Sequence, residues 1–360
     1  MTDLAPPGAD AELLRDAAAR LVADHGGLPG LRRALQAPAE TRPANWDRFA
    51  ALGWLGAVLE EPEGPGLPLA DLGPLLETLA AGLVPDPYIA VAVATAATLG
   101  ALPGCGTLRA GLADGTALPL LAHPPAEAPG TEPARARPVG TGWTVDGRVP
   151  VLPGAAAADA LLLPAAGPDG AILLRLGPAD AGLVPFRLLD GTPAGALHMA
   201  GAPAELLAAG PEAHAAAAAG LAAGRAAGMA DAVGAMEAAL GATRAWVAER
   251  QQFGRPIGAF QVIQHGLADM FAAVQEARSM ALLALRLAGA PPTPRRDRLM
   301  AAARVKVSDA ARLVAHRAIQ YHGGMGVSDE TEVAHLCRRL LAVDTLHGPR
   351  AAALAAYQAA

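Results

Sequence analysis

Arg250-Gln-Gln-Phe-Gly254-Arg-Pro-Ile-Gly258 separates two long helical segments and carries more pattern than a helix end requires. An arginine at a helix C-terminus ordinarily stabilises the helix dipole, and a glycine after it adopts the left-handed cap conformation. That interpretation stays open. The alternative is that Arg250 presents a planar cation to a phosphate or an adenine, beside the aromatic surface of Phe253.

A glycine-rich stretch about seventy residues later, Gln320-Tyr-His-Gly323-Gly324-Met-Gly326, ends another helical segment. One glycine is sufficient for a helix cap, and the others would let the backbone approach a group such as a pyrophosphate. A flexible turn between buried helices explains the stretch equally well. The chain has no Walker loop and no Gly-x-Gly-x-x-Gly after a strand, so a nucleotide would be held in another way.

The composition favours a globular protein of two or three structural units. The chain has 360 residues, of which 52 % are hydrophobic and 17 % charged, and its net charge is −6. This weakly acidic balance without a basic cluster argues against nucleic-acid binding. Two distant cysteines exclude a structural zinc site and give no support for a disulfide, and we expect no metal. No signal peptide and no membrane span is recognisable, so we expect a cytoplasmic protein.

The chain divides into three zones that predict an α+β fold. Residues 1–115 are expected to form an N-terminal helical domain, 116–207 a small middle β domain, and 208–360 a C-terminal bundle of four long helices. Asp146-Gly147 predicts a hairpin turn in the β zone. In the last zone, Thr293-Pro294 predicts a helix start, and Ser328, followed by two acids, predicts the start of the final helix.

The span 242–349 resembles the C-terminal domain of acyl-CoA dehydrogenases, which carry Arg-x-x-Phe-Gly and then Gln-x-x-Gly-Gly-x-Gly at this separation. The order of the zones is similar too, and Leu52-Gly-Trp-Leu-Gly56 with Glu61-Pro-Glu-Gly-Pro-Gly66 is similar to the family's N-terminal pattern. The resemblance covers essentially the whole chain, with weak support between residues 100 and 210. It implies FAD as cofactor, an acyl-CoA as substrate and an electron-transfer flavoprotein as electron acceptor.

The resemblance also implies which residues contact the cofactor. In that family, the matching residues contact the ADP half of an FAD that is bound mainly to the neighbouring subunit. They are Arg250, Phe253, Gln320, Gly323 and Gly324. The family holds the flavin ring against its own β domain with Thr-Glu-Pro and Trp-x-Thr. The matching places read Ala122-His-Pro124 and Pro150-Val-Leu152, where proline has no N–H donor and leucine has no hydroxyl.

The family's catalytic base has no matching carboxylate. Removing an α-proton suits a desolvated carboxylate, and counting twenty-four residues from Gly323 reaches His347 instead. The family's alternative position, twenty-six residues before Arg250, falls on Gly224. His347 is a candidate catalytic base because imidazole titrates in the right range, although it also fits a histidine at a helix end. We interpret Glu237, Asp269 and Asp344 as dipole or surface charges.

These losses favour one interpretation of the function. The chain resembles the degenerate subunit of some bacterial heterotetrameric acyl-CoA dehydrogenases that act on sterol side chains. It would complete the FAD site of a second acyl-CoA dehydrogenase-like subunit. One alternative is a self-sufficient homotetramer, a dimer of dimers, that uses His347 or an unaligned carboxylate as base. Another is a related flavin oxidase or monooxygenase, which needs no α-proton abstraction. The sequence does not define the length or shape of the acyl chain.

Overall fold

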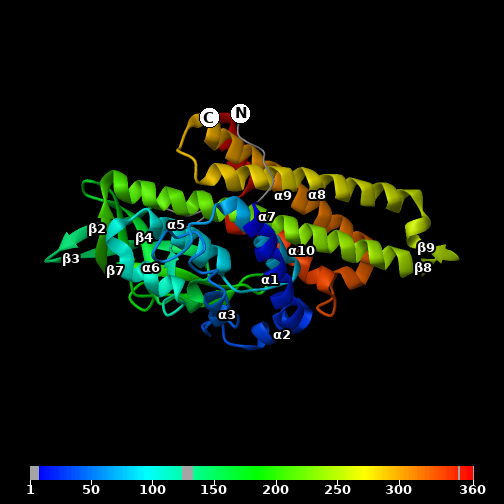
Figure 1. The fold of residues 1–360 in the computed structure, drawn as a ribbon, viewed down its shortest axis with the longest axis horizontal. Coiled ribbons are helices and arrows are strands. Elements are labelled where there is room, and N and C mark those ends of the chain that lie inside the picture. The colour runs from blue at the N-terminus through cyan, green and yellow to red at the C-terminus, as the bar shows by residue number, and fades with distance from the viewer. Residues whose placement is uncertain (1–7, 124–132, 348, 360) are drawn as a thin grey trace. The chain divides into compact units, whose positions relative to one another are not determined.

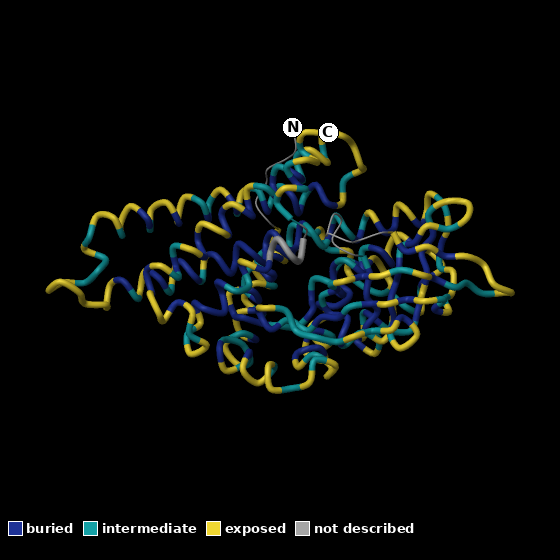
Figure 2. The backbone as a smooth tube through the Cα atoms, turned by 180° about the vertical axis from the view of Figure 1, so that it is seen from behind, coloured by how far each residue is buried: buried dark blue, intermediate teal, exposed yellow. Residues whose placement is uncertain are grey.

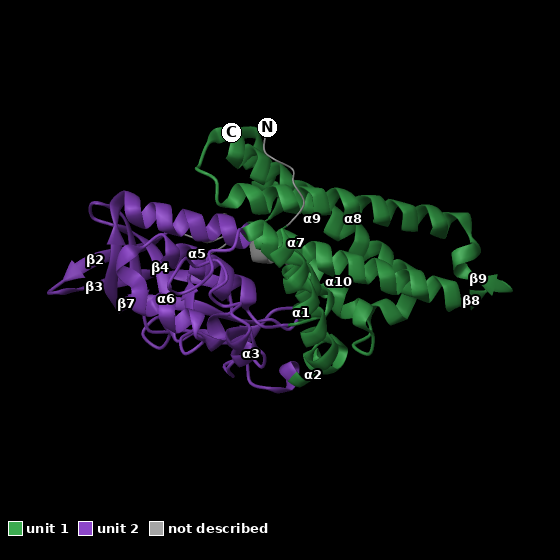
Figure 3. Cartoon of the chain, in the orientation of Figure 1, with its two compact units in different colours: residues 1–33, 69–84, 226–360 green, residues 34–68, 85–225 purple. Residues whose placement is uncertain are grey.

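The computed structural model describes residues 8–123, 133–347 and 349–359, with the side chains of residues 343–347 excepted. Contacts group the chain into two compact units, which Figure 3 colours separately. The helical unit comprises residues 1–33, 69–84 and 226–360, and the β unit comprises residues 34–68 and 85–225. The division at residues 115 and 207 stays a proposal; the first strand begins at Pro119 and the last long strand ends at Ala209.

The helical unit is built around three long helices. They are α7 (Gly210–Glu249), whose second half belongs to this unit, α8 (Gln261–Ala288) and α9 (Pro294–His322). Figure 1 shows α8 along both α7 and α9. Arg278 of α8 ties this arrangement together, because its guanidinium lies 3.1 Å from Glu77 and 3.2 Å from Glu237 of α7.

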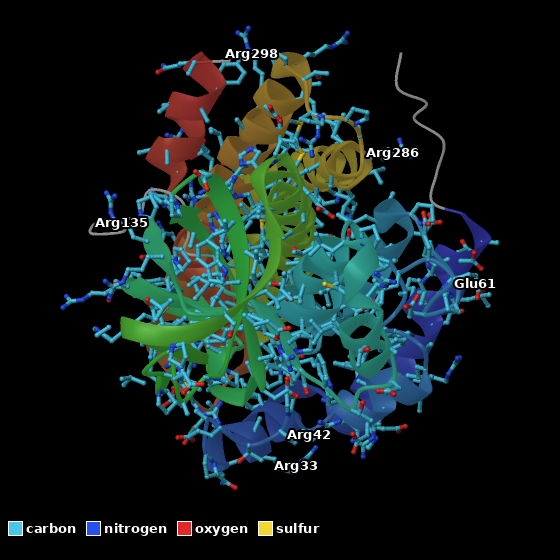
Figure 4. The ribbon with its side chains drawn as sticks, turned by 90° about the vertical axis from the view of Figure 1, so that its left-hand side faces the viewer. Arg33, Arg42, Glu61, Arg135, Arg286 and Arg298 are labelled. Atoms are coloured by element: carbon cyan, nitrogen blue, oxygen red, sulfur yellow. The ribbon has the colours of Figure 1, made fainter. Side chains whose placement is uncertain are left out.

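Shorter helices complete the helical unit. They are α1 (Ala9–His25), the first part of α2 (Gly27–Gln36), η1 (Leu69–Leu72), α4 (Gly73–Ala81), η6 (Gly323–Val327), α10 (Glu332–His347) and α11 (Arg350–Ala359). A partly buried ion pair joins two of the elements, since Arg339 of α10 binds both carboxylate oxygens of Asp231 on α7, at 2.8 and 2.5 Å. Figure 4 labels Arg298 of α9 beside α11, where its guanidinium lies 4.8 Å from the ring centre of Tyr357.

The β unit contains a sheet that closes on itself. Its strands are β1 (Pro119–Leu121), β2 (Ala134–Val139), β3 (Gly142–Pro153), β4 (Ala160–Gly167), β5 (Gly170–Leu176), β6 (Val184–Arg187) and β7 (Pro193–Ala209). The order is β1-β4-β2-β3-β7-β5, and β5 pairs again with β4. This closure leaves few free strand edges. β1 runs parallel to β4 and is buried throughout.

Helices also belong to the β unit. They are α3 (Trp46–Ala51), η2 (Ile89–Thr95), α5 (Ala96–Gly100), η3 (Pro103–Cys105) and α6 (Gly106–Ala113). The η2 segment is a π-helix, in which Thr95 Oγ1 donates to the carbonyl of Ala90 at 2.8 Å. The same hydroxyl accepts the backbone N–H of Leu121 at 2.7 Å. Thr95 therefore fixes strand β1 to this helix.

The sequence predicted the start of α9 correctly. The side-chain oxygen of Thr293 accepts the N–H of Arg296 at 3.1 Å, as an N-cap residue does. Two other local predictions are wrong. Ser328 does not begin the last helix, because its hydroxyl accepts the N–H of Glu330 in a local turn and α10 begins at Glu332. A further helix, α11, follows α10.

The hairpin predicted at Asp146-Gly147 is the second error. Both residues lie inside β3, at a bulge between Val145 and Gly147. The Asp146 carboxylate accepts the N–H of Gly201 on β7 at 2.6 Å, so the aspartate links two strands of the sheet and does not form a turn. Gly147 has a φ of +157°, a conformation that glycine adopts at bulges.

Both cysteines are free and buried in the structure. Burial raises the pKa of the Cys337 thiol to about 12, so this sulfur stays protonated at neutral pH. Within the described ranges, histidine, cysteine and acidic side chains do not gather in groups of three that could hold a metal ion. The helices of the same residues include none that is long and apolar enough to cross a membrane.

Candidate functional site

Arg250 lies at the junction between α7 and a short hairpin. The hairpin is formed by β8 (Gln251–Gln252) and β9 (Arg255–Pro256), and Figure 1 shows it beyond the end of α7. Its base closes where the N–H of Ile257 donates to the carbonyl of Arg250 at 2.9 Å. The Arg250 side chain is exposed. The helix ends as the sequence predicts, and the hairpin explains why the pattern is longer than a simple cap.

Phe253 occupies the tip of this hairpin in an unusual conformation. Its φ is +53°, which an aromatic residue rarely adopts, and its side chain is 90 % exposed. Residues 250–255 are all exposed, and Figure 2 draws exposed backbone in yellow. Backbone strain together with an exposed apolar ring is unfavourable for an isolated chain, and such strain is concentrated at binding sites.

The second predicted motif lies at the end of α9. Gln320 is exposed, and the helix ends at His322. Gly323 follows with a φ of +60° and a ψ of −136°, which only glycine adopts readily. A Cβ placed on Gly323 or on Gly324 would meet no atom within 4 Å. The backbone of this turn is therefore open to close approach by another molecule.

The structure brings the two motifs together through contacts that the sequence did not indicate. The indole N–H of Trp246 donates to the carbonyl of Tyr321 at 3.1 Å. The Trp246 ring stacks on the imidazole of His322, with centroids 5.2 Å apart and 19° between the planes. Arg250 follows Trp246 by one helical turn, and its guanidinium carbon lies 6.0 Å from the indole centre. The ends of α7 and α9 therefore form one surface.

His322 is held as a neutral imidazole in this surface. It is 8 % exposed, and its Nδ1 lies 2.9 Å from the carbonyl oxygen of Ala318, which requires Nδ1 to carry the proton. Burial lowers the pKa of His322 below its usual range, and the bond to Ala318 opposes this only in part. Near Arg250 the stack therefore adds no second positive charge at neutral pH.

Acidification is expected to destabilise the chain partly through His322. The folded state lowers the pKa of His322, so the unfolded chain binds the proton more readily, and this contribution to stability is lost as the pH falls below about 6.5. We expect His322→Gln to show a smaller decline in the free energy of unfolding between pH 7.5 and pH 5.5, measured with urea. His316→Gln, at an exposed position of the same helix, is the control. Equal declines in both variants would contradict this role.

The two positions matched to a catalytic base offer no carboxylate in the structure. His347 is the last residue of α10, and its side chain lies outside the described part of the chain. Gly224 faces the π-helix: a Cβ placed there would lie 3.0 Å from Cβ of Ala94. A glutamate at this position would have to displace that packing. The acids Glu237 and Asp269 lie near arginines, at 3.2 Å from Arg278 and 4.0 Å from Arg317.

At the places matched to the flavin-ring contacts, Ala122, Pro150 and Leu152 have no side-chain hydrogen-bond donor. The N–H of Ala122 donates to the carbonyl of Leu162 at 2.7 Å, and the residue is fully buried. Pro124 lies outside the described residues. Pro150 sits at a register shift in β3, where its missing N–H costs no ladder bond, and Leu152 is buried in the sheet.

Comparison with known proteins finds similar chains over most of this sequence. Residues 214–358 match the family profile of the acyl-CoA dehydrogenase C-terminal domain. The acyl-CoA dehydrogenase IpdE2 of Mycobacterium tuberculosis is 28 % identical over 91 % of this chain and 89 % of its own length. The solved structure of the "Tcur3481-Tcur3483 steroid ACAD G363A variant" superposes with a TM-score of 0.86 at 28 % identity, over 97 % of this chain and 96 % of that chain.

Residues 214–358 of this chain carry the C-terminal domain of the acyl-CoA dehydrogenase family, and over most of its length the chain is similar to acyl-CoA dehydrogenases. The fold class predicted from the sequence, helical with a sheet in the middle and a C-terminal helical region, is confirmed as the acyl-CoA dehydrogenase fold. The ChsE4–ChsE5 complex of Mycobacterium tuberculosis shares the fold, with a TM-score of 0.84 at 22 % identity over 97 % of this chain and 96 % of that chain.

Proposed function

We propose that this chain is a subunit of an FAD-dependent acyl-CoA dehydrogenase complex and completes the FAD site of a partner subunit. The observation that carries the proposal is the exposure of the Arg250–Phe253 hairpin and of the Gly323–Gly324 turn, joined into one surface by Trp246. The positions matched to the base and the flavin-ring contacts lack the usual groups. The chain thus keeps the residues that would contact FAD in a neighbouring subunit, and it lacks the base and the ring contacts that an FAD site of its own would need.

The chemistry of this surface fits the ADP half of FAD. Arg250 supplies a planar, permanently charged donor for a phosphate, and Gly323 and Gly324 offer backbone that no side chain covers. Phe253 offers an exposed ring against which an adenine can stack, and Gln320 offers an exposed amide. When bound, FAD supplies the hydride acceptor for the α,β-desaturation of an acyl-CoA thioester, an oxidoreduction at a CH–CH group.

We further propose that the partner is a second acyl-CoA dehydrogenase-like chain and that an electron-transfer flavoprotein receives the electrons. Two structural relatives support the first part, because each is a pair of different chains, Tcur3481 with Tcur3483 and ChsE4 with ChsE5. The first of these relatives is a steroid ACAD, which supports a sterol-derived acyl-CoA as substrate.

The proposal is tested by the flavin content of the purified chain. Expressed alone, the chain is expected to retain little FAD, whereas coexpression with an acyl-CoA dehydrogenase-like chain from the same gene cluster should give a complex with tightly bound FAD and desaturase activity. Stoichiometric FAD and desaturation by the chain alone would contradict the proposal and favour a homotetramer. In that case His347→Ala would test the base, by loss of desaturation with the flavin retained. Oxygen consumption without an electron-transfer flavoprotein would indicate an oxidase.

A further inference from the structure

Trp246 is the residue that joins the two halves of the candidate FAD surface, and neither motif contains it. It lies on α7 one turn before Arg250, and it reaches across to the end of α9. The last carbonyls of a helix have no partner within that helix. Trp246 satisfies one of them, the carbonyl of Tyr321, with its indole N–H at 3.1 Å. It thereby caps α9 at the point where the glycine turn begins.

We propose that Trp246 is a positioning residue that holds Arg250 and the Gly323–Gly324 turn in register, so that they bind the diphosphate of FAD as one preformed site. This inference rests on the function proposed above. Trp246 contacts Arg250 and the end of α9 rather than the reacting atoms, so we expect its replacement to change the affinity for the cofactor.

Three contacts carry the inference. The hydrogen bond to Tyr321 fixes the height of the indole on α9. The stack on His322 fixes the plane of the indole, and His322 is itself held by the carbonyl of Ala318 at 2.9 Å. The guanidinium of Arg250 lies over the Trp246 ring, with its carbon 6.0 Å from the indole centre. At this distance a cation and an aromatic ring still attract each other. Loss of the indole would release the arginine and the turn together.

The backbone around Trp246 makes this coupling direct. The N–H of Arg250 donates to the carbonyl of Trp246 at 2.9 Å, the last hydrogen bond of α7. The carbonyl of Arg250 then accepts the N–H of Ile257, which closes the hairpin. A shift of the indole would therefore move the base of the hairpin. A ligand that spans both segments would meet them in the wrong relative position, and binding would incur the ordering cost that a preformed site avoids.

The test compares Trp246→Phe with Trp246→Leu in the assembled complex. Phenylalanine keeps a stacking ring and loses the N–H, so FAD binding should weaken about fivefold, the effect of one hydrogen bond. Leucine loses the ring as well, and binding should weaken about thirtyfold. Dissociation constants are measured for FAD and for ADP, the half of the cofactor that this surface would hold. ADP binding should weaken by the same factors as FAD binding.

A second measurement needs no flavin. In the chain alone, hydrogen exchange is followed in the hairpin, residues 250–257, and in the turn, residues 323–327. Both segments should exchange faster in Trp246→Phe, because one residue holds both. Faster exchange in the hairpin alone would overturn the proposed coupling. Trp143→Phe, a half-buried tryptophan in β3, is the matched control and should change neither segment nor FAD binding.

The outcomes separate this inference from the function on which it rests. A wild-type complex that binds FAD, with an unchanged dissociation constant in both Trp246 variants, would overturn the positioning role and leave the proposed function standing. A wild-type complex that binds no FAD would overturn both. Weaker FAD and ADP binding together with an unchanged melting temperature and unchanged subunit association would support the positioning role over a general effect on folding.

Discussion

Replacing Arg250 by glutamine is expected to weaken FAD binding by the assembled complex about a hundredfold. The guanidinium of Arg250 is exposed at the end of α7, where it can donate two hydrogen bonds to one phosphate. A hydrogen bond to a charged group contributes about 1.5–3 kcal/mol, and the upper part of that range corresponds to this factor. Glutamine keeps a polar side chain of similar reach and removes the charge. The dissociation constant is measured by flavin fluorescence on the flavin-free complex.

The variant Arg250→Lys separates the contribution of the positive charge to FAD binding from that of the planar guanidinium geometry. Lysine keeps a positive charge and loses the planar fork, so binding should be intermediate between wild type and Arg250→Gln. Arg244→Gln is the matched control, since Arg244 is exposed on the same helix and lies in neither motif. It should leave the dissociation constant unchanged. Undiminished FAD binding in Arg250→Gln would show that the phosphates are bound by other residues, and the proposed role of the hairpin would have to be abandoned.

Gly234→Ala is expected to destabilise the chain by about 3 kcal/mol. A Cβ on Gly234 would lie 2.0 Å from the carbonyl oxygen of Glu77 and 2.5 Å from its Cα. Both are backbone atoms of α4, so relief requires the two helices to move apart. The shift also disturbs Glu77, whose carboxylate lies 3.1 Å from Arg278. The free energy of unfolding is measured with urea or by thermal melting.

Gly241→Ala is the matched control on the same helix. It lies two helical turns later, is exposed, and a Cβ there would meet nothing within 4 Å. Alanine favours the helix over glycine, so this variant should be more stable by about 0.5–1 kcal/mol. If both variants changed stability by similar amounts in the same direction, close packing of α7 against α4 would not be what requires a glycine at residue 234.

Much of the fold was predictable because its signals are local. The Ala-rich run that forms α7 has almost no polar face, and its burial follows from that pattern. Thr293 before a proline gave the start of α9 for the same reason. The errors arose where one dipeptide serves two structures. Asp146-Gly147 suits a hairpin turn as well as a bulge, and only the pairing of β3 with β7 decides between them.

In the candidate site, too, the residues in local motifs were predictable and those that depend on long-range contacts were not. Arg250, Phe253 and the glycine pair were found because they form short motifs, and their proposed role in cofactor binding stays a prediction. Trp246 was missed, and His322 was given no role within its motif, because their contact joins helices far apart in sequence and no spacing encodes it. The weak signal available was the position of Trp246 one turn before Arg250, on the same helix face. Gly224 could not be interpreted without knowing that Ala94 lies against it.

Phe253 also bears on how such a protein must be produced in the cell. Its ring is almost fully open to water at a strained tip, and the ring of Phe260 meets it only edge to face, with centroids 6.1 Å apart. Under the function proposed above, a chain made without its partner subunit would expose this hydrophobic ring from the moment it folds. Synthesis of the two subunits in matched amounts, from neighbouring genes on a shared transcript, would shorten the time for which the Phe253 ring stays exposed to solvent.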